Sequence, residues 1–563
     1  MESTAKQSQS PADSAATPPR ARVVLIGSLV SSVLLFLAFP PVGWWPLAWL
    51  APAGWCAIVA TRDLGSRPYR VIYLTAIAHW LAVIHWIRLP HWSAHFGWLV
   101  LAAYLAVYIP AFVCLARQAV HRFRIPIWVA CPVVWMGLEL IRGYMLTGFS
   151  MALLGHTQVE WTQIIQIADV GGAYLVGALI MLVGSSLANS WIRWRERENA
   201  SLRDHAPLAV AATSVGLALF YGANAIPLPF DPQSSGTRTQ VALIQGSRDT
   251  TFTAADDPAV TLDHYRTLTT NAVAQHPDVD LIVWPESMHT IVWCEAKPPL
   301  KVPADYGGDE RMFAEQVNYM SDRGKYEAGW FARQFGKSAL VGCSALEIDN
   351  QPLRRFNSAL AISKSGNVTG KYNKMHPVMF GEYVPLGKTF PWLYRLTPMG
   401  SGLESGTEPV AVEADKLLLS PSICYENTVP HLIRRQVRQL IDRGTPPDAL
   451  VTISNDGWFW GSSQLDLHLT CGVFRAVEMR RPMLIAANTG FSAWIDAAGR
   501  VRSRGPRREP GYVIAEIERH NQSQSLYLRF GDWMAAIAAA CCVGLAWSGW
   551  RNARAPFSAA KSA

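Results

Sequence analysis

Cys424 closes an apolar run, and it has the residue type and position of a catalytic nucleophile. The run continues directly into Tyr425 and Glu426, so that Leu417–Glu426 reads LLLSPSICYE. An apolar run of this length, closed by Ser and Pro, is typical of a buried strand that reaches a sharp turn. The cysteine would then lie at the end of a rigid element. Considered alone, however, Cys424 is better explained as a core residue, because free cysteine is among the most buried residue types.

Two other stretches supply the ionisable groups that a cysteine nucleophile needs. Leu281–Ser287 (LIVWPES) is an apolar run that ends in Glu286, and Lys371–Pro385 (KYNKMHPVMFGEYVP) carries Lys374 and Glu382. A free thiol, with a pKa of about 8.5, is only a few per cent thiolate near pH 7. A carboxylate beside the thiol can take its proton. A lysine beside both groups would keep the carboxylate ionised and stabilise the oxyanion of an attacked carbonyl.

Each charged residue also has a structural explanation. Glu286 could cap the segment that follows it, Lys374 could be a surface charge, and Glu382 could belong to a turn. These explanations weaken when the residues are taken together, because the carboxylate, lysine and cysteine signals all end apolar strands in one part of the chain. His376 is the nearest histidine, but it stands in no obvious partner motif. The nine cysteines show no CxxC pair and no metal-ligand spacing, so we expect no metal and no cofactor.

The first part of the chain is much more apolar than the rest and predicts a membrane domain. Apolar residues make up 50% of the 563 residues and charged residues only 16%, which is low for a soluble protein. Met1–Arg22 is rich in Ser, Ala and Pro and is expected to be disordered. A membrane helix needs about 20 mostly apolar residues. Seven such helices are predicted before residue 229 and one near the C-terminus: Val23–Phe39, Trp44–Ala60, Val71–Ile87, Phe96–Ala116, Pro126–Ile141, Ile165–Ile192, Pro207–Ile226 and Trp533–Trp550.

The loop charges predict the orientation of these helices. Arginine and lysine gather in alternate loops, whereas the intervening loops carry none, Arg88 alone or Arg142 alone. This is the positive-inside pattern, and it places both termini in the cytoplasm. The chain is thus divided into a tail (1–22), a membrane domain (23–228), an outer domain (229–530), a closing helix (531–550) and a second tail (551–563). The net charge of +8 comes mostly from loop arginines, and no basic patch interleaved with aromatic residues predicts nucleic-acid binding.

The stretch after the fifth predicted helix is unusually polar. Arg142–Phe149 reads RGYMLTGF, and six polar residues follow it: His156, Gln158, Glu160, Gln163, Gln166 and Asp169. A charge near lipid costs roughly 2.5–3.5 kcal/mol per residue on insertion scales, so these groups need protein or water partners. They either line a polar cavity that faces the outer domain or form an interfacial loop, and the sequence favours neither alternative.

The outer domain alternates short strands with helical stretches, which indicates an α/β domain built on a mixed sheet. The early part of the polar stretch Lys297–Gly329 is expected to be an inserted loop. Helices are predicted over Leu262–Gln275, Met312–Phe335, Val429–Arg443 and Leu465–Arg480. Strands are predicted over Gln240–Gln245, Leu281–Pro285, Ala339–Cys343, Ser358–Ser363, Leu417–Ile423, Ala449–Ser454 and Met483–Ala487.

The order WPE, then K, then C resembles the nitrilase superfamily of carbon–nitrogen hydrolases, whose members use a Glu–Lys–Cys triad on an α-β-β-α sandwich. Seven membrane helices, such a domain and one closing helix narrow the resemblance to the apolipoprotein N-acyltransferases. It covers nearly the whole chain after the tail. It is strong only because several stretches match together: RGYMLTGF at Arg142–Phe149, VALIQG at Val241–Gly246, IVWPES at Ile282–Ser287, YNKMHPVMFGEYVPL at Tyr372–Leu386, ICYE at Ile423–Glu426, SNDGWF at Ser454–Phe459 and LYLRFGDW at Leu526–Trp533.

The resemblance implies a role for each of the residues singled out above. It makes Glu286 the general base, Lys374 the residue that stabilises the oxyanion and Cys424 the nucleophile. Glu382 matches an additional essential glutamate, which should assist the lysine or the base. No metal or cofactor is implied.

The two residues after the nucleophile match the family as well. They are Tyr425, whose backbone N–H is expected to be a second oxyanion donor, and Glu426, which we expect to have a supporting role.

The implied reaction has two half-steps and takes place at a membrane. The cysteine attacks an ester carbonyl of a phospholipid, and the resulting thioester passes its acyl chain to the N-terminal cysteine α-amine of a diacylated apolipoprotein. This is covalent catalysis with ping-pong kinetics. The resemblance also implies a monomer in the bacterial inner membrane, with the catalytic domain on the periplasmic side. Phe390–Leu396 (FPWLYRL) and Trp458–Trp460 (WFW) are either membrane-dipping or lid loops, or ordinary surface or core aromatics.

The sequence departs from the family pattern in three places. Gly246–Thr253 (GSRDTTFT) replaces a stretch that helps to form the substrate opening, Pro377 and Met379 alter the segment before Glu382, and the insertion near Lys297–Gly329 is extra. Two other functions remain open. The triad alone equally fits a membrane-tethered amidase that hydrolyses small amides, and the domain could be retained as a non-enzymatic scaffold. The intact triad argues against the scaffold.

Overall fold

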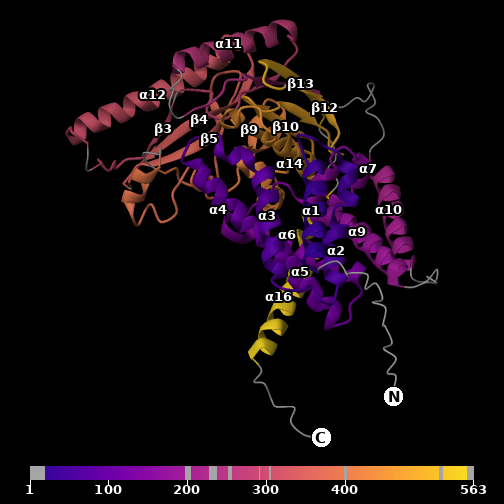
Figure 1. Ribbon diagram of the computed structural model, residues 1–563. Coiled ribbons are helices and arrows are strands. Elements are labelled where there is room, and N and C mark those ends of the chain that lie inside the picture. The colour runs from indigo at the N-terminus through magenta and orange to yellow at the C-terminus, as the bar shows by residue number, and fades with distance from the viewer. Residues whose placement is uncertain are drawn as a thin grey trace, which may run out of the picture.

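The computed structural model describes residues 20–196, 205–226, 238–251, 257–290, 292–303, 306–350, 352–397, 402–518 and 524–554. A helical domain contains the first part of the chain and the last helix, and an α/β domain sits on one end of it (Figure 1). The tails expected over 1–22 and 551–563 lie almost wholly outside the described residues.

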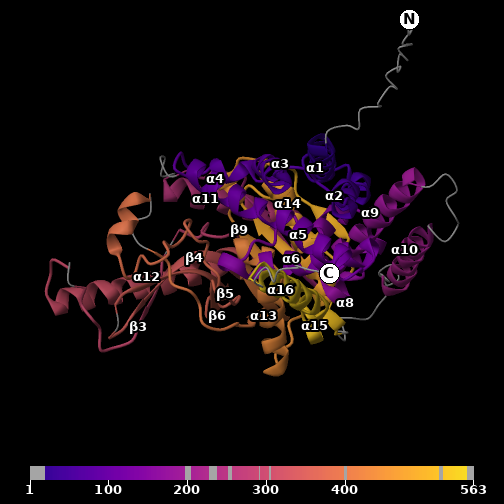
Figure 2. The ribbon, with the colours of Figure 1, turned by 60° about the horizontal axis from the view of Figure 1, so that its bottom comes forward.

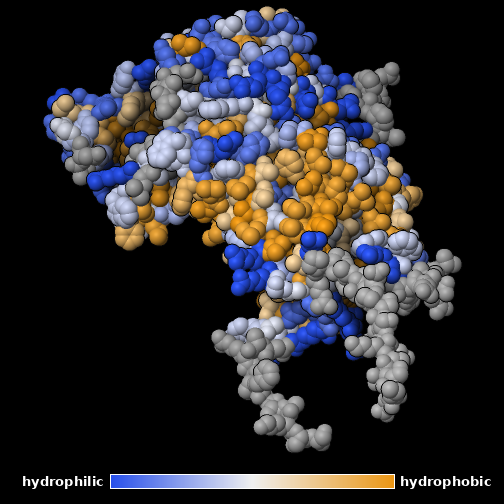
Figure 3. All heavy atoms as spheres, in the orientation of Figure 1, coloured by the Kyte–Doolittle hydropathy of each residue, from blue (hydrophilic) through white to orange (hydrophobic). Residues whose placement is uncertain are grey.

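Long apolar helices dominate the helical domain. Six of the described helical segments have the length and composition to cross a membrane: Ala21–Ala38, Ala94–His121, Ile127–Thr147, Ala173–Arg195, Ala206–Ala225 and Trp533–Arg551. They correspond to α1 (Arg20–Ala38), α4 with α5 (Ala94–Ala106 and Tyr108–His121), α6 (Ile127–Tyr144), α9 (Ala173–Glu196), α10 (Ala206–Ala225) and α16 (Trp533–Arg554). Apolar side chains form a broad belt over the surface of this domain, below the more polar outer domain (Figure 3). The chain is therefore a multi-pass membrane protein.

Two expected membrane helices are shorter in the structure. Trp44–Ala60 folds as a 3₁₀ turn, η1 (Trp45–Trp49), followed by the nine-residue α2 (Pro52–Ala60). Val71–Ile87 corresponds largely to α3 (Pro68–Val83), which has 16 residues. Both helices begin at a proline, which fits the first turn of a helix. α2 starts later than expected, whereas α3 starts before the expected Val71 and ends earlier, at Val83. The total of eight membrane helices stays a prediction.

The expected helix Ile165–Ile192 is wrong in its first part. Gly172 has a φ of +71° and interrupts the helix, so α9 begins at Ala173. The preceding stretch forms two four-residue helices, α7 (Thr162–Ile165) and α8 (Ala168–Gly171). The sequence did not predict this break, because the pattern of apolar residues does not indicate that a single glycine adopts a left-handed backbone conformation.

The outer domain is an α-β-β-α sandwich, as the resemblance implies. One sheet has seven strands in the order β13-β1-β2-β4-β5-β6, with β3 also paired to β4, and the other has six in the order β12-β11-β10-β9-β8-β7. The first sheet comprises β1 (Arg238–Gln245), β2 (Leu281–Val283), β3 (Trp293–Ala296), β4 (Ser338–Ile348), β5 (Arg354–Ile362), β6 (Val368–Asn373) and β13 (Gly511–Glu518). The second comprises β7 (Val412–Ala414), β8 (Leu417–Ile423), β9 (Ala449–Ser454), β10 (Met483–Ala487), β11 (Ala493–Ile495) and β12 (Val501–Arg504).

Both faces of the central strands are buried, which explains their continuous apolar sequences. In β1, Val241 and Leu243 lie in the core between the sheets, whereas Ala242 and Ile244 pack in a second core that includes residues of α11 (Pro258–Gln275) and α12 (Glu310–Phe335). The end of the domain that carries α12 and β3 extends sideways beyond the helical domain (Figure 1, Figure 2). Residues 297–303 and 306–309, between β3 and α12, form neither helix nor strand, in agreement with the expected loop.

The remaining helix layer joins the two domains. α13 (Pro430–Asp442) and α14 (Gln464–Met479) cover the outer face of the second sheet. Their buried residues, Val437 and Phe474 among them, belong to the same continuous apolar core as the membrane helices. The second sheet is therefore held against the membrane domain through α13 and α14, which brings the ends of its strands close to the membrane helices.

Candidate active site

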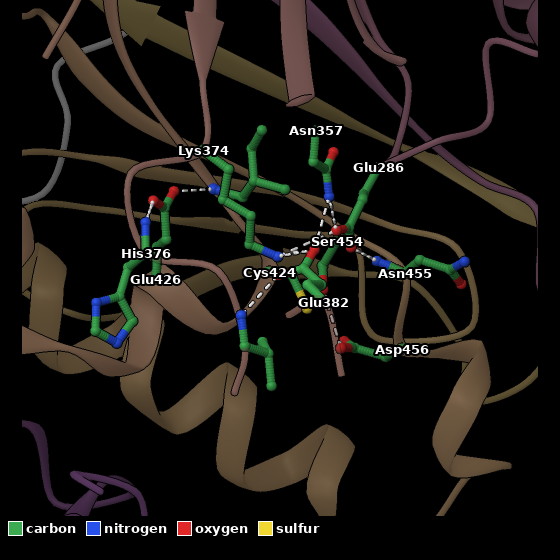
Figure 4. A network of polar contacts seen from close by, with 12 residues as sticks. Glu286, Asn357, Lys374, His376, Glu382, Cys424, Glu426, Ser454, Asn455 and Asp456 are labelled. Atoms are coloured by element: carbon green, nitrogen blue, oxygen red, sulfur yellow. Dashed lines mark hydrogen bonds and ion pairs between the residues drawn. The ribbon is translucent and has the colours of Figure 1, made fainter. Parts of the chain in front are cut away.

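The three proposed catalytic residues all follow directly or closely upon strands of the sandwich. Glu286 comes shortly after β2, Lys374 directly after β6, and Cys424 directly after β8. β2 and β6 belong to one sheet and β8 to the other. The strand ends bring the three side chains together in one cluster with Glu382, as Figure 4 shows. The cluster thus spans both sheets of the sandwich.

Lys374 joins the two carboxylates. Its Nζ lies 2.8 Å from Oε1 of Glu382 and 3.4 Å from Oε1 of Glu286. The side-chain amide of Asn357, on β5, donates to the same two oxygens, at 2.6 Å to Glu286 and 3.1 Å to Glu382. Lys374 is 1% exposed and Glu286 is 5% exposed, so these charges are shielded from water and satisfy one another.

The second oxygen of each carboxylate is held by a backbone N–H. Asn455 N donates to Oε2 of Glu286 at 2.8 Å, and Val378 N donates to Oε2 of Glu382 at 2.7 Å. Each carboxylate is therefore fixed at both oxygens, which sets its direction as well as its position. A group held in this way is preorganised to accept a proton without reorientation.

The local charges shift the pKa values of three groups in the cluster. Burial raises the pKa of the Cys424 thiol well above its ordinary value, and Glu286 raises it further, while Lys374 acts in the opposite direction. Burial opposes a charge on Lys374, but Glu286 and Glu382 raise the pKa of its ammonium. Burial likewise opposes a charge on Glu382, but Lys374 lowers the pKa of that carboxyl. Cys424 is thus a neutral thiol at pH 7 and needs a base, whereas Lys374 and Glu382 stay charged.

Cys424 occupies a strained backbone conformation at the mouth of the cluster. Its φ is +54°, a region that costs a residue other than glycine on the order of 1–3 kcal/mol. It begins a 3₁₀ turn, η7 (Cys424–Thr428), and it is partly exposed, whereas Ile423 before it is buried. Cys424 also packs against the apolar core between the two sheets, so the core reading describes part of its environment. Strain of this kind is characteristic of functional sites, where surrounding contacts hold an unfavourable residue in place.

Glu426 ties the lysine segment to the cysteine segment. Its Oε1 accepts from the backbone N–H groups of Met375 (2.7 Å) and His376 (2.9 Å), which follow Lys374. Its Oε2 accepts from Ile423 N at 2.7 Å and from the hydroxyl of Tyr372 at 2.9 Å. The carboxylate is buried and holds the two chain segments of the site at a fixed separation.

Replacing Glu426 with glutamine should loosen this connection. The amide nitrogen of Gln would face N–H or O–H donors at one of the two oxygen positions, so at least one pair of hydrogen bonds is lost. We expect Glu426→Gln to lower the free energy of unfolding by about 2–3 kcal/mol, measured by thermal unfolding in detergent. Glu413→Gln, at an exposed position in β7, serves as the control and should unfold like the unaltered protein. Equal unfolding of the two variants would show that Glu426 does not hold the segments together.

Tyr425 connects the nucleophile to the membrane domain. Its hydroxyl donates to the carbonyl of Gly148 at 2.7 Å, within the stretch Arg142–Phe149. Nearby, the ring of Tyr144 stacks on His431 of α13 with a centroid separation of 4.0 Å, and its hydroxyl donates to Asp532 at 2.8 Å. The polar stretch after α6 therefore lies directly against the strand end that carries Cys424.

The two alternatives for that polar stretch each describe part of it. Tyr144, Met145 and Leu146 are exposed, as expected for an interfacial loop. Arg142 is buried and, with His79 and Glu139, lines a cavity of about 30 Å³. All residues that line this cavity belong to the membrane domain, and Arg142 is the one member of the polar stretch among them.

Three of the six polar residues that follow, Gln158, Gln166 and Asp169, are buried with protein partners, whereas Glu160 and Gln163 are exposed. Asp169 pairs with Arg480, directly after α14, at 2.5 Å and accepts from Tyr221, and Gln166 donates to the carbonyl of Ala498 at 2.8 Å. Gln158 accepts from the ring nitrogen of Trp49 at 2.9 Å. The charge of Asp169 and the amide of Gln166 thus attach the outer domain to the membrane domain.

Three residues of the site were not recognised from the sequence. Asn357 bridges both carboxylates, and Asp456 and His468 lie beneath the nucleophile, with His468 Nε2 3.0 Å from the Cys424 carbonyl. Asn357 and Ser358 form a buried polar pair directly before the apolar run of β5, which is a usable signal. Asp456 stood within the SNDGWF stretch, but His468 shows no signal, since it is one polar residue on a mixed helix.

Comparisons with known proteins place the chain in a family. Residues 31–186 match the model of the apolipoprotein N-acyltransferase N-terminal domain, and residues 240–524 match the carbon–nitrogen hydrolase model. Apolipoprotein N-acyltransferases of Rhodopirellula baltica and Geobacter metallireducens are each 32% identical to this chain; the alignments cover 92% of it and 95% and 93% of those proteins. An amidase from Nesterenkonia sp., a solved structure, aligns with 53% of this chain and 95% of its own at 17% identity and a TM-score of 0.35. The chain belongs to the apolipoprotein N-acyltransferase family.

Proposed function

We propose that this protein transfers a fatty acyl chain from a phospholipid, through a thioester on Cys424, to the N-terminal α-amine of diacylated apolipoproteins. The names of its relatives support an acyltransferase that acts on lipoproteins. The observation that carries the mechanism is the cluster of Glu286, Lys374 and Glu382 around a cysteine that contacts the membrane domain through Tyr425. An acyl chain can stay in the bilayer while its carbonyl reaches such a site.

In the first half-reaction, Glu286 takes the proton of Cys424, and the thiolate attacks the ester carbonyl. The carbonyl π electrons move to oxygen, and the oxyanion is stabilised by the ammonium of Lys374 and the backbone N–H of Tyr425. The intermediate collapses by breaking the ester C–O bond. The leaving lysophospholipid alkoxide takes the proton from Glu286, which leaves an acyl thioester on Cys424 and an ionised carboxylate.

In the second half-reaction, the neutral α-amine of the lipoprotein attacks the thioester carbonyl. Glu286 accepts a proton from the amine, and the same two donors stabilise the second oxyanion. Collapse breaks the C–S bond and releases the amide, and the cysteine thiolate recovers the proton from Glu286. Because donor and acceptor use the site in turn, the proposal predicts ping-pong kinetics.

Glu382 has a different role from Glu286 in this scheme. It holds the ammonium of Lys374 at 2.8 Å and keeps it charged, so that Lys374 is not neutralised when Glu286 becomes protonated. We further propose that the protein acts as a monomer in the bacterial inner membrane with the catalytic domain on the periplasmic side. The alternation of loop arginines supports that orientation.

A reconstituted transfer assay tests the function. The purified protein in phospholipid vesicles is mixed with a synthetic diacylated lipopeptide whose cysteine α-amine is free. The expected products are N-acylated lipopeptide and lysophospholipid in equal amounts. A lipopeptide with a blocked α-amine is the matched control and should yield no acylated product. Hydrolysis of small amides without any acylated lipopeptide would favour the membrane-tethered amidase instead.

A further inference from the structure

His468 lies directly behind the nucleophile and contacts its backbone. His468 projects from α14, and its Nε2 lies 3.0 Å from the carbonyl oxygen of Cys424. Its Nδ1 lies 3.1 Å from each carboxylate oxygen of Asp456. His468 is 4% exposed and Asp456 is 2% exposed. This pair is therefore a buried contact that reaches Cys424 from the side of the second helix layer.

The partners of the ring fix its protonation state. A carbonyl oxygen and a carboxylate can only accept hydrogen bonds, so both ring nitrogens must donate, which only the imidazolium can do. Burial opposes this charge, but Asp456 raises the pKa of His468 above its ordinary value. Asp456 is itself held by the hydroxyl of Ser454 at 2.9 Å and the side-chain amide of Gln464 at 3.3 Å. The imidazolium is thus held rigidly against the Cys424 carbonyl.

That carbonyl belongs to the same peptide group as the backbone N–H of Tyr425. A hydrogen bond from a cation to an amide oxygen polarises the amide and strengthens its N–H as a donor. The contact also fixes the orientation of this peptide, which follows the strained residue Cys424 with its φ of +54°. Tyr425 N–H stands in the first turn of η7, where backbone N–H groups have no partner within the turn.

We propose that His468, held by Asp456, is a positioning residue that orients and polarises the Cys424–Tyr425 peptide as an oxyanion donor. The inference rests on the proposed function, because it assigns His468 a part in the formation of the same thioester. His468 touches neither the substrate nor the thiol in this account. It acts on the stability of the oxyanion and leaves the proton transfer to Glu286 unchanged.

Two reactions of Cys424 separate these effects. Acylation by a phospholipid passes through an oxyanion, whereas alkylation by iodoacetamide displaces iodide and forms none. In His468→Leu, the rate of acyl-enzyme formation at saturating phospholipid should fall about 10- to 100-fold, less than the loss of a whole oxyanion donor. The rate of alkylation should change much less than the rate of acylation, because alkylation needs no oxyanion donor; it reports any change in the thiol, whose pKa is raised by burial and by the nearby charges of Glu286 and Asp456. His468→Gln keeps an N–H donor at a similar reach and should recover part of the lost acylation rate.

Asp456→Asn provides a second variant that keeps the imidazole ring. The ring then loses the carboxylate that keeps it charged, so acylation should slow while alkylation does not. This variant carries the test if His468→Leu does not fold.

The outcomes separate this inference from the proposed function. If the unaltered protein forms no acyl adduct on Cys424, the proposed function fails. If that adduct forms and the His468 and Asp456 variants acylate at the unaltered rate, only the inference is overturned. It is also overturned if acylation and alkylation fall in parallel, since His468 would then act on the thiol or on the fold.

Discussion

Replacing Cys424 with alanine should abolish acyl transfer, with a loss of at least about 10⁴-fold, because the covalent route no longer exists. The substitution removes one sulfur atom from a partly exposed position, so the free energy of unfolding should change by less than about 1 kcal/mol. The measurement is the rate of lipopeptide N-acylation in vesicles, together with thermal unfolding of the same preparation.

Cys343→Ala is the matched control for that variant. Cys343 lies in β4, is fully buried, and packs in the core that includes residues of α11 and α12, on the side away from the second sheet. Its replacement should reduce stability by about 1 kcal/mol or more through the cavity it leaves and leave the transfer rate unchanged. A Cys424→Ala protein that still transfers acyl chains at a comparable rate would remove Cys424 from the mechanism.

Replacing Lys374 with methionine should damage both catalysis and stability. Methionine has a similar length but no charge, so Glu286 and Glu382 would face each other without the ammonium that lies 3.4 Å and 2.8 Å from them. Removing one partner of a buried ion pair costs about 3–5 kcal/mol. Loss of an oxyanion donor should slow transfer a further ~10²- to 10³-fold. The transfer rate is measured at a temperature where the variant remains folded, so that it reports the catalytic effect alone. Thermal unfolding measures the effect on stability.

Lys371→Met is the matched control, because it removes a similar ion pair away from the proposed site. Lys371 lies on β6, three positions before Lys374, and its Nζ also joins two carboxylates, Glu295 at 2.9 Å and Glu347 at 2.8 Å. Replacing Lys371 should also lower the free energy of unfolding. The transfer rate at saturating phospholipid, however, should stay within about twofold of that of the unaltered protein. If the two lysine variants lose activity equally, the effect of Lys374 is structural and its role at the oxyanion is wrong.

The strands of the outer domain were the most predictable elements. Continuous apolar runs predicted the central strands β1, β2, β4, β5, β8, β9 and β10, because a strand buried on both faces has little choice of residue. The strands that the sequence did not predict lie toward the edges of the sheets, except β3, which pairs with β4 beside the main strand order. β12 (Val501–Arg504) is an example: its pattern VRSR is mostly exposed, and only its pairing with β11 makes it a strand. Such pairing is a long-range property that a local pattern cannot predict.

The membrane helices were predictable in position but not in continuity. Apolar length alone extends the helix that contains α9 back to Ile165, whereas Gly172 breaks it. The break has a structural consequence, since it lets Asp169 turn toward Arg480, which directly follows α14. A charged residue within an apolar run was the available signal that the run does not continue as one membrane helix.

Glu286 and Cys424 were recognisable because each follows an apolar strand, whereas Lys374 follows the mostly polar strand β6 and Glu382 follows no strand. The supporting residues were not recognisable. Glu286, Lys374, Glu382 and Cys424 lie together in the structure. His468 is distant from most of them in sequence and reaches Cys424 only because α14 packs against η7 and β10. Contacts of this kind depend on how helices pack on the sheet, which the spacing of residues along one chain segment does not specify.

The intact mass of the purified protein tests the central claim most directly. The protein is incubated with a phospholipid of one defined acyl chain and no acceptor. Its mass should increase by one acyl group, the increase should be absent in Cys424→Ala, and neutral hydroxylamine should remove it, as expected for a thioester. Addition of a diacylated lipopeptide should then move the acyl group to the peptide α-amine. If the lipopeptide becomes N-acylated by a protein that never carries an acyl group on Cys424, the thioester mechanism is contradicted.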